Sequence, residues 1–157
     1  MDQDKSIKYA LDMLDKLKAR DFLIDGIIDK YYLEPIMKEY SDYGGKREII
    51  LLGMIIGYEF SKTNSPIPNC VKDTVRSSRV DIGRIKEFPV EGISLMLSIL
   101  IDKYGIEKVI SEDLNEKFEE LRTFAENGVK IIYCEIISSR QLRQERFAYI
   151  NDIKKLL

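Results

Sequence analysis

The side chains that most often perform chemistry in proteins are scarce in this sequence. It has no histidine and only two cysteines, Cys70 and Cys134. Without histidine, the commonest general base and the usual activator of a serine or cysteine nucleophile are missing. Two thiolates alone cannot complete a four-ligand zinc site. We therefore expect no catalytic residues, no metal site and no cofactor.

Acidic side chains recur at helical spacing in two places, where they could hold a magnesium ion with a bound phosphate. The first group is Asp21, Asp25 and Asp29, and the second begins at Glu112. Acids spaced in this way beside lysines are more typical of a solvated helix face, which is the interpretation we favour. The chain also lacks the GxxxxGK[ST], GxGxxG and GxSxG motifs of nucleotide-binding proteins and hydrolases. A metal-dependent enzyme or toxin is the least favoured hypothesis.

Charge is segregated along the chain, although the formal net charge is only −2. Six basic and two acidic residues lie in 62–86, whereas six acidic and two basic residues lie in 111–126. The segment after residue 138 is basic again. Basic side chains presented on a helical scaffold can contact nucleic-acid phosphates or a protein partner. The candidate binding residues are Lys72, Arg76, Arg79, Arg84, Lys86, Arg140, Arg143 and Arg146.

A competing interpretation is that these basic residues pair with the acidic segment or stay solvated, as most charge runs do. A net acidic chain does not coat nucleic acid without specificity, because that needs an overall basic surface. We favour a non-enzymatic adaptor that binds a larger protein partner, with nucleic acid as a second ligand. The alternative is a stand-alone nucleic-acid-binding regulator that uses residues 72–86. The oligomeric state is left open.

The elements expected to position these residues are helices, because apolar residues recur at helical spacing through most of the chain. The predicted helices span residues 6–18, 21–31, 35–43, 46–61, 90–104, 111–127 and 139–157, with a short turn in 71–77. Ser111 is the expected N-cap of its helix, and Asn127 with Gly128 the expected end. Residues 129–137 suit a buried strand or a buried helix, and we favour helix because no partner strand is evident.

These elements predict an all-α fold, an irregular or orthogonal bundle of about six to eight helices in a single domain of 157 residues. The apolar segments 49–58 and 90–101 should form its centre. Gly53 and Gly57 would let another helix approach closely.

The apolar run at 49–58 is about half the ~20 residues needed to span a membrane. With no signal-like N-terminus, we expect a cytoplasmic protein without a membrane partner and without a disulfide.

One family resemblance adds to this reading. The segment REIILLGMIIGYEFSKTNSPIP (47–68) has an apolar stretch, a glycine-aromatic pair and a polar turn with proline. A second apolar segment at 90–104 precedes the acidic FEELRTFAENGVKII (118–132). This order of segments resembles that of the small Dnd-system-associated proteins, which are encoded beside DNA phosphorothioation genes. The resemblance implies a helical accessory component of a prokaryotic DNA-modification and phage-defence locus, and it carries over no catalytic residues.

Overall fold

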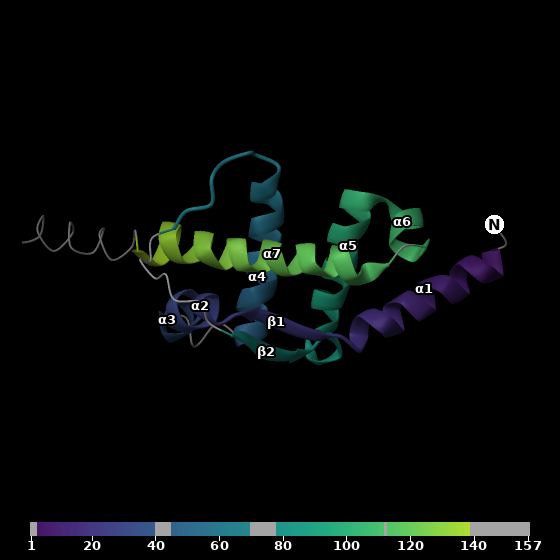
Figure 1. The fold of residues 1–157 in the computed structure, drawn as a ribbon, viewed down its shortest axis with the longest axis horizontal. Coiled ribbons are helices and arrows are strands. Elements are labelled where there is room, and N and C mark those ends of the chain that lie inside the picture. Colours follow the sequence, from purple (N-terminus) through teal and green to yellow (C-terminus); the bar gives the residue numbers. More distant parts are fainter. Residues whose placement is uncertain (1–2, 40–44, 70–77, 112, 139–157) are drawn as a thin grey trace, which may run out of the picture.

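Helices make up most of the chain, and one small sheet joins two distant segments (Figure 1). We describe residues 3–39, 45–69, 78–111 and 113–138 of a computed structural model. The elements in chain order are α1 (Gln3–Lys18), β1 (Asp21–Asp25), α2 (Gly26–Ile28), the π-helix η1 (Asp29–Leu33), α3 (Glu34–Glu39), α4 (Lys46–Ser61), β2 (Arg79–Arg84), the 3-10 helix η2 (Ile85–Glu87), α5 (Val90–Tyr104), α6 (Ile106–Ser111), α7 (Leu114–Ile132) and the π-helix η3 (Tyr133–Ser138). The prediction of a mostly helical fold is confirmed.

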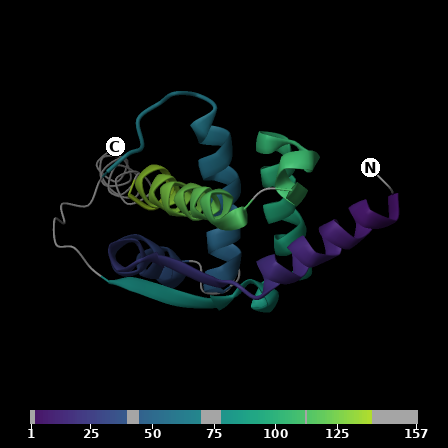
Figure 2. The same cartoon turned by 45° about the vertical axis from the view of Figure 1, so that its right-hand side comes forward.

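The centre of the molecule is the crossing of α4 and α7 (Figures 1 and 2). A Cβ atom on Gly128 would lie 1.5 Å from the carbonyl oxygen of Gly53, and one on Gly57 would lie 1.9 Å from that of Phe124. Only a hydrogen atom fits at these positions, so the two helix backbones touch. The expected close approach at Gly53 and Gly57 is confirmed. The neighbour, however, is α7 and not the 90–101 helix that we expected at the centre.

The beginning and end predicted for the acidic helix are both wrong. Ser111 ends α6, and α7 is capped by Asp113, whose carboxylate accepts a hydrogen bond of 3.0 Å from the backbone N–H of Asn115. Helix α7 also continues through Gly128. The absence of a side chain at Gly128 allows the close contact with α4 and does not mark the end of the helix. Helix then runs on to Ser138 through η3. This outcome confirms helix for 129–137.

A two-stranded antiparallel sheet replaces the first part of the helix predicted over 21–31 and includes residues 79–84, for which the sequence predicted no helix or strand. In β1 the buried Phe22 and Ile24 alternate with less buried residues, which is the period of a strand. Its partner β2 pairs Asp25 with Arg79 and Asp21 with Arg84, and the register shifts between these ends. Gly83 has a φ of 111°, a conformation that glycine adopts readily and that accommodates the irregularity. The predicted helix over 21–31 therefore begins only at Gly26.

Three other predicted helices are found where the sequence placed them. The bounds of α4 and α5 match the prediction, and α5 ends at Gly105, whose φ is 86°. The first helix begins somewhat earlier than expected, at Gln3. The predicted helices at 35–43 and 139–157 and the turn at 71–77 lie partly or wholly outside the described residues.

One hydrophobic core runs through the described chain and joins the sheet to the helices. The ring of Phe22 lies 5.5 Å from the Phe88 ring and 5.8 Å from the Phe118 ring, between centroids, so β1 is fixed against both η2 and α7. Cys134, in η3, is disulfide-bonded. The expectation that the chain carries no disulfide is therefore wrong.

Candidate functional site

Only three of the eight predicted basic binding residues lie in the part of the chain that the structure describes. Lys72, Arg76, Arg140, Arg143 and Arg146 lie outside the described residues. The other three lie in or just after β2, where Arg79 and Arg84 mark the two ends of the strand and exposed Lys86 follows in η2.

Acidic residues lie opposite both arginines of β2. An Nη1 to Oε1 distance of 3.7 Å joins Arg79 to Glu119 of α7, and Nε of Arg84 lies 3.9 Å from a carboxylate oxygen of Asp21. About half of each side chain is exposed, so these ion pairs are weak. The arrangement nevertheless agrees with the interpretation that basic residues of this segment pair with acids of the same chain.

The acids suggested as magnesium ligands serve three separate structural purposes. Asp21 faces Arg84, whereas Asp25 accepts a hydrogen bond from Ile27 N–H and caps α2. Asp29 is buried and lies 2.6 Å from the Nζ atom of Lys46. Within the described ranges, no three acidic or cysteine side chains come together in a way that could hold a metal ion.

Two tyrosine-carboxylate clusters also carry perturbed pKa values. Burial and a hydrogen bond to Asp102 raise the pKa of Tyr58, and burial and a hydrogen bond to Glu120 raise that of Tyr104. Both shifts move the phenol farther from neutral pH, where a general base must work. These clusters tie α4 to α5 and α5 to α7, which is a structural use of the tyrosines.

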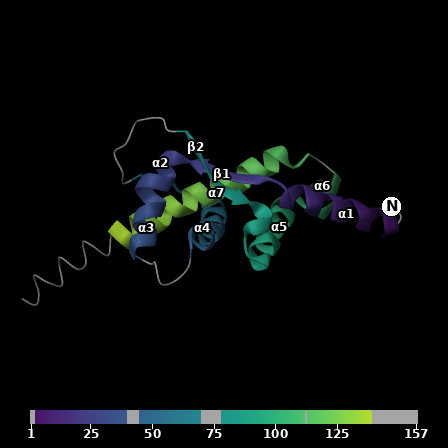
Figure 3. The ribbon, with the colours of Figure 1, turned by 90° about the horizontal axis from the view of Figure 1, so that it is seen from below.

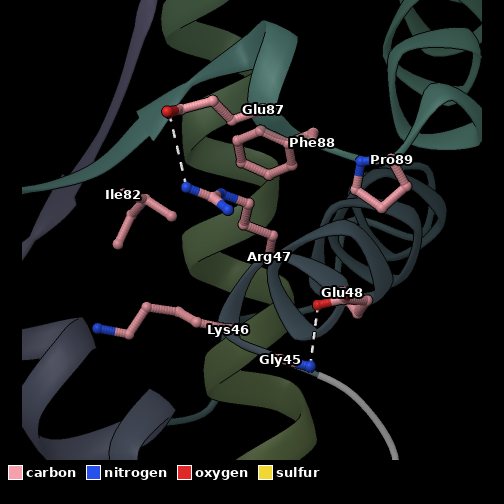
Figure 4. Close-up of a pocket in the computed structure, with 8 residues that line it drawn as sticks. All are labelled: Gly45, Lys46, Arg47, Glu48, Ile82, Glu87, Phe88 and Pro89. Atoms are coloured by element: carbon pink, nitrogen blue, oxygen red, sulfur yellow. Dashed lines mark hydrogen bonds and ion pairs between the residues drawn. The ribbon is translucent and has the colours of Figure 1, made fainter.

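A pocket of about 540 Å³ lies at the start of α4 (Figure 4). Arg47 is one of its lining residues, with its guanidinium 5.9 Å from the centroid of Phe88 and its Nη2 atom 3.5 Å from a carboxylate oxygen of Glu87. The neighbouring Lys46 points toward Asp29, and Glu48 accepts a hydrogen bond of 2.9 Å from Gly45 N–H. Both cations therefore already face carboxylates, so the pocket offers a ligand little unbalanced charge.

A second hollow, between α4 and α5, is the more distinctive feature. We call it the α4/α5 groove; it has a volume of about 490 Å³ and is lined by Glu48, Leu51, Leu52, Ile55, Pro89, Glu91, Gly92 and Leu95. Its apolar surface is open to solvent, since Leu52 is 49% and Ile55 40% exposed. The only charged residues in its lining are the two glutamates, one on each helix.

Close packing at Gly92 positions the two walls of this groove. A Cβ atom there would lie 2.5 Å from a methyl group of Leu51, so the absence of a side chain brings α5 near α4 at the floor of the groove. The other face of α4 is fixed by its crossing with α7 (Figure 2). The exposed apolar residues are therefore held on a well-packed helix.

Sequence reasoning did not find this groove. The stretch 46–61 is apolar nearly all round, which predicts burial on every side. The structure buries Ile50, Met54 and Tyr58 but leaves Leu52 and Ile55 exposed. No signal in the sequence separates these two groups, because both consist of large apolar residues.

Comparison with known proteins does not assign a family to this chain. No protein-family model, curated protein or solved structure matches it. Among the described helices, none is long and apolar enough to cross a membrane. A functional interpretation therefore depends on the surfaces described above.

Proposed function

We propose that this chain is a non-enzymatic helical adaptor that binds a larger protein partner through the α4/α5 groove. The single observation that supports this proposal best is the exposure of Leu52 and Ile55 in a groove without basic residues. Contiguous exposed apolar surface is uncommon on proteins that act alone and often marks a site of interaction.

The shape and lining of the groove favour an amphipathic helix as the ligand. Two helices form its walls, and such grooves accept the apolar face of a third helix through residues spaced three or four apart. On α4 the exposed apolar residues Leu52 and Ile55 are themselves three apart, so they can contact successive turns of a bound helix. The apolar side chains would supply most of the affinity.

The charge at the rim specifies what should flank that apolar face. Glu48 and Glu91 belong to opposite walls, and both are exposed. A partner helix with lysine or arginine beside its apolar face would complement both walls, whereas an acidic helix would be repelled. The proposed partner segment is therefore a basic amphipathic helix.

The resemblance of 47–68 and 118–132 to the Dnd-system-associated proteins suggests where such a partner belongs. We propose that it is a component of a prokaryotic DNA-modification or phage-defence system. Nucleic acid would then be a second ligand, contacted through the basic segment 72–86. The groove does not depend on this placement, because its binding chemistry is the same for any basic helix.

The proposal can be tested with two synthetic helical peptides of about 18 residues, roughly five turns. Both carry leucine on one face, and lysine in one peptide is replaced by glutamate in the other. We expect the leucine-lysine peptide to bind, measured by fluorescence anisotropy, and the leucine-glutamate peptide not to bind. Leu52→Ala with Ile55→Ala should weaken binding about tenfold or more, since central apolar contacts commonly contribute over 1 kcal/mol.

Matched controls test whether the peptide binds at the groove or responds only to the acidic charge of the whole protein. Glu91→Gln should weaken binding by about twofold to fivefold, because a rim charge contributes less than 1 kcal/mol. Glu107→Gln on α6 removes the same charge at an exposed site outside the groove and should have no effect. Equal binding of both peptides, or equal affinity of the Leu52/Ile55 variant, would contradict the proposal.

A separate titration addresses the alternative of a stand-alone nucleic-acid-binding regulator. That alternative predicts DNA or RNA binding that falls steeply with salt and is lost in Arg76→Ala with Arg79→Ala. The ion pair between Arg79 and Glu119 weakens the case for it. Salt-dependent binding of nucleic acid without any binding of the leucine-lysine peptide would replace the adaptor proposal.

A further inference from the structure

Helix α1 carries a second exposed apolar surface, at the opposite end of the molecule from α2 and α3 (Figures 1 and 3). It packs on α6 and η2 through one side, where Leu17 is buried. Two other apolar residues of α1, Ile7 and Leu11, are 53% and 56% exposed. Helix α1 therefore exposes large apolar side chains to water.

Leu11 borders a second groove, which we call the α1 groove. It has a volume of about 250 Å³, and every residue that lines it is apolar: Ala10, Leu11, Met13, Leu14, Leu97, Ile101, Ile106, Val109 and Ile110. Ile101 and Ile106 on the opposite wall are also exposed. The apolar surface is thus continuous from α1 across to α5 and α6.

The charged residues that share one line of α1 with Leu11 indicate what covers this groove. Residues at alternating spacings of four and three lie along one line of a helix. On α1 the line that passes through Leu11 reads Asp4, Lys8, Leu11, Asp15 and Lys18. The order of charge is negative, positive, apolar, negative, positive. If a second such helix runs in the opposite direction with its Leu11 at the same level, each acid of one helix lies opposite a base of the other.

From this pattern we infer that α1 is a self-association surface, on which a second copy of the chain lies antiparallel with the two Leu11 side chains at the symmetry axis. In that arrangement Lys8 faces Asp15 of the second copy, and Asp4 faces its Lys18. A parallel pair would instead place each charge opposite its own kind, which is destabilising. Two-fold symmetry repeats each favourable pair, and each copy covers the α1 groove of the other.

The composition of α1 distinguishes this occupant from a membrane. Helices that lie on membranes usually carry lysine and arginine on their polar face. In α1, Asp12 and Asp15 interrupt the lysines, and the exposed apolar strip is narrow. Both acids would be repelled by anionic lipid, and Asp15 is needed in the antiparallel pair.

The test is sedimentation velocity of the full chain over a range of concentrations. We expect a concentration-dependent dimer for the unaltered chain and a monomer for Leu11→Glu, which places two carboxylates at the symmetry axis. Leu11 is exposed, so this variant should keep the circular dichroism spectrum and unfolding midpoint of the parent. A chain that stays monomeric at about 100 µM, or a Leu11→Glu variant that still dimerises, would overturn the inference.

A charge exchange tests the antiparallel geometry itself. Lys8→Asp and Asp15→Lys should each weaken the dimer about threefold to tenfold, since each creates two like-charge pairs. The double variant restores complementary pairs and should return to within about twofold of the parent. Lys16→Asp on the opposite edge of α1 is the matched control and should change little.

Failure of the double variant to recover would overturn the antiparallel arrangement. Binding of the chain to anionic phosphatidylserine vesicles without any dimer in solution would assign α1 to a membrane surface and overturn the inference as well. Neither result bears on the α4/α5 groove, because α1 does not line it.

Discussion

The crossing of α4 with α7 and the packing of α1 show two opposite uses of apolar residues. At the crossing, Gly53 and Gly128 let two backbones touch, and the side chains around them are buried. On α1, Leu17 is buried, but Ile7 and Leu11 remain exposed within the same helix. The crossing thus serves folding, whereas Ile7 and Leu11 of α1 are left largely uncovered in the single chain. Helix α4 shows both uses, because its buried side chains pack at the crossing and its exposed apolar side chains line the α4/α5 groove.

The largest expected effect on stability comes from filling the crossing. Gly128→Ala would place a Cβ atom within 1.5 Å of the Gly53 carbonyl oxygen, so the helices must separate. We expect the free energy of unfolding to fall by about 3 kcal/mol or more, although alanine favours a helix by about 1 kcal/mol. Urea unfolding followed by circular dichroism measures this change.

Gly105→Ala is the matched control for that substitution. No atom lies within 4 Å of its Cβ position, and its cost comes only from a φ of 86°. A left-handed conformation costs a residue with a side chain about 1–2 kcal/mol. If both glycine variants lost the same stability, close contact at the crossing would not be the reason for its glycines.

A smaller loss is expected where α7 begins. Asp113→Ala removes the carboxylate that accepts the hydrogen bond from Asn115 N–H, and loss of such a cap costs about 1 kcal/mol. Ser111→Ala tests the cap that the sequence predicted and should cost less, because Ser111 belongs to α6 and its hydroxyl bonds only the Glu107 carbonyl within that helix. Thermal unfolding of the two variants side by side would show the reverse order if the sequence prediction were right.

Whether an element could be predicted from the sequence depended on how clear its local signals are. Helices α4 and α5 were found with their bounds, because their apolar runs end at strong local signals such as Gly105. The strand Asp21–Asp25 was missed, since a five-residue segment also fits a helical pattern and its partner β2 lies far along the chain. Gly128 was misread because a glycine that ends a helix and one that admits another helix look alike in sequence.

The candidate site was less accessible to sequence reasoning than the fold. Segregated charge suggested that basic residues of 62–86 pair with the acidic segment 111–126, and the ion pair between Arg79 and Glu119 agrees with this. The ion pair between Arg84 and Asp21 was not foreseen, because local charge does not show which other segment lies beside a residue. The exposed side of α4 was equally hidden, because exposure depends on which neighbours cover a helix and not on the hydrophobicity of its residues.

The smallest predicted effect depends on pH. Burial raises the pKa of Glu120, but hydrogen bonds from Lys103 and Tyr104 outweigh it and lower that pKa below its ordinary value. A carboxyl whose pKa is lower in the folded state contributes stability above its unfolded pKa and loses it as the pH falls through its folded pKa. Glu120→Gln should therefore be less stable than the parent at pH 7, by less than about 1 kcal/mol because the pair is partly exposed.

Unfolding curves recorded from pH 7 downward measure this difference. It should shrink as the pH falls through the folded pKa of Glu120, where protonation removes the charge that distinguishes the two proteins. A difference that persists unchanged at low pH would show that Glu120 acts through packing and not through its charge.

The central claim is that the exposed apolar residues of α4 serve binding, whereas its buried residues serve folding. Its most direct test measures the Leu52→Ala with Ile55→Ala variant twice, once for the free energy of unfolding and once for affinity toward the leucine-lysine peptide. We predict a stability within about 1 kcal/mol of the parent, since both side chains are partly exposed, together with an affinity at least about tenfold weaker. A large loss of stability with unchanged affinity would contradict the account.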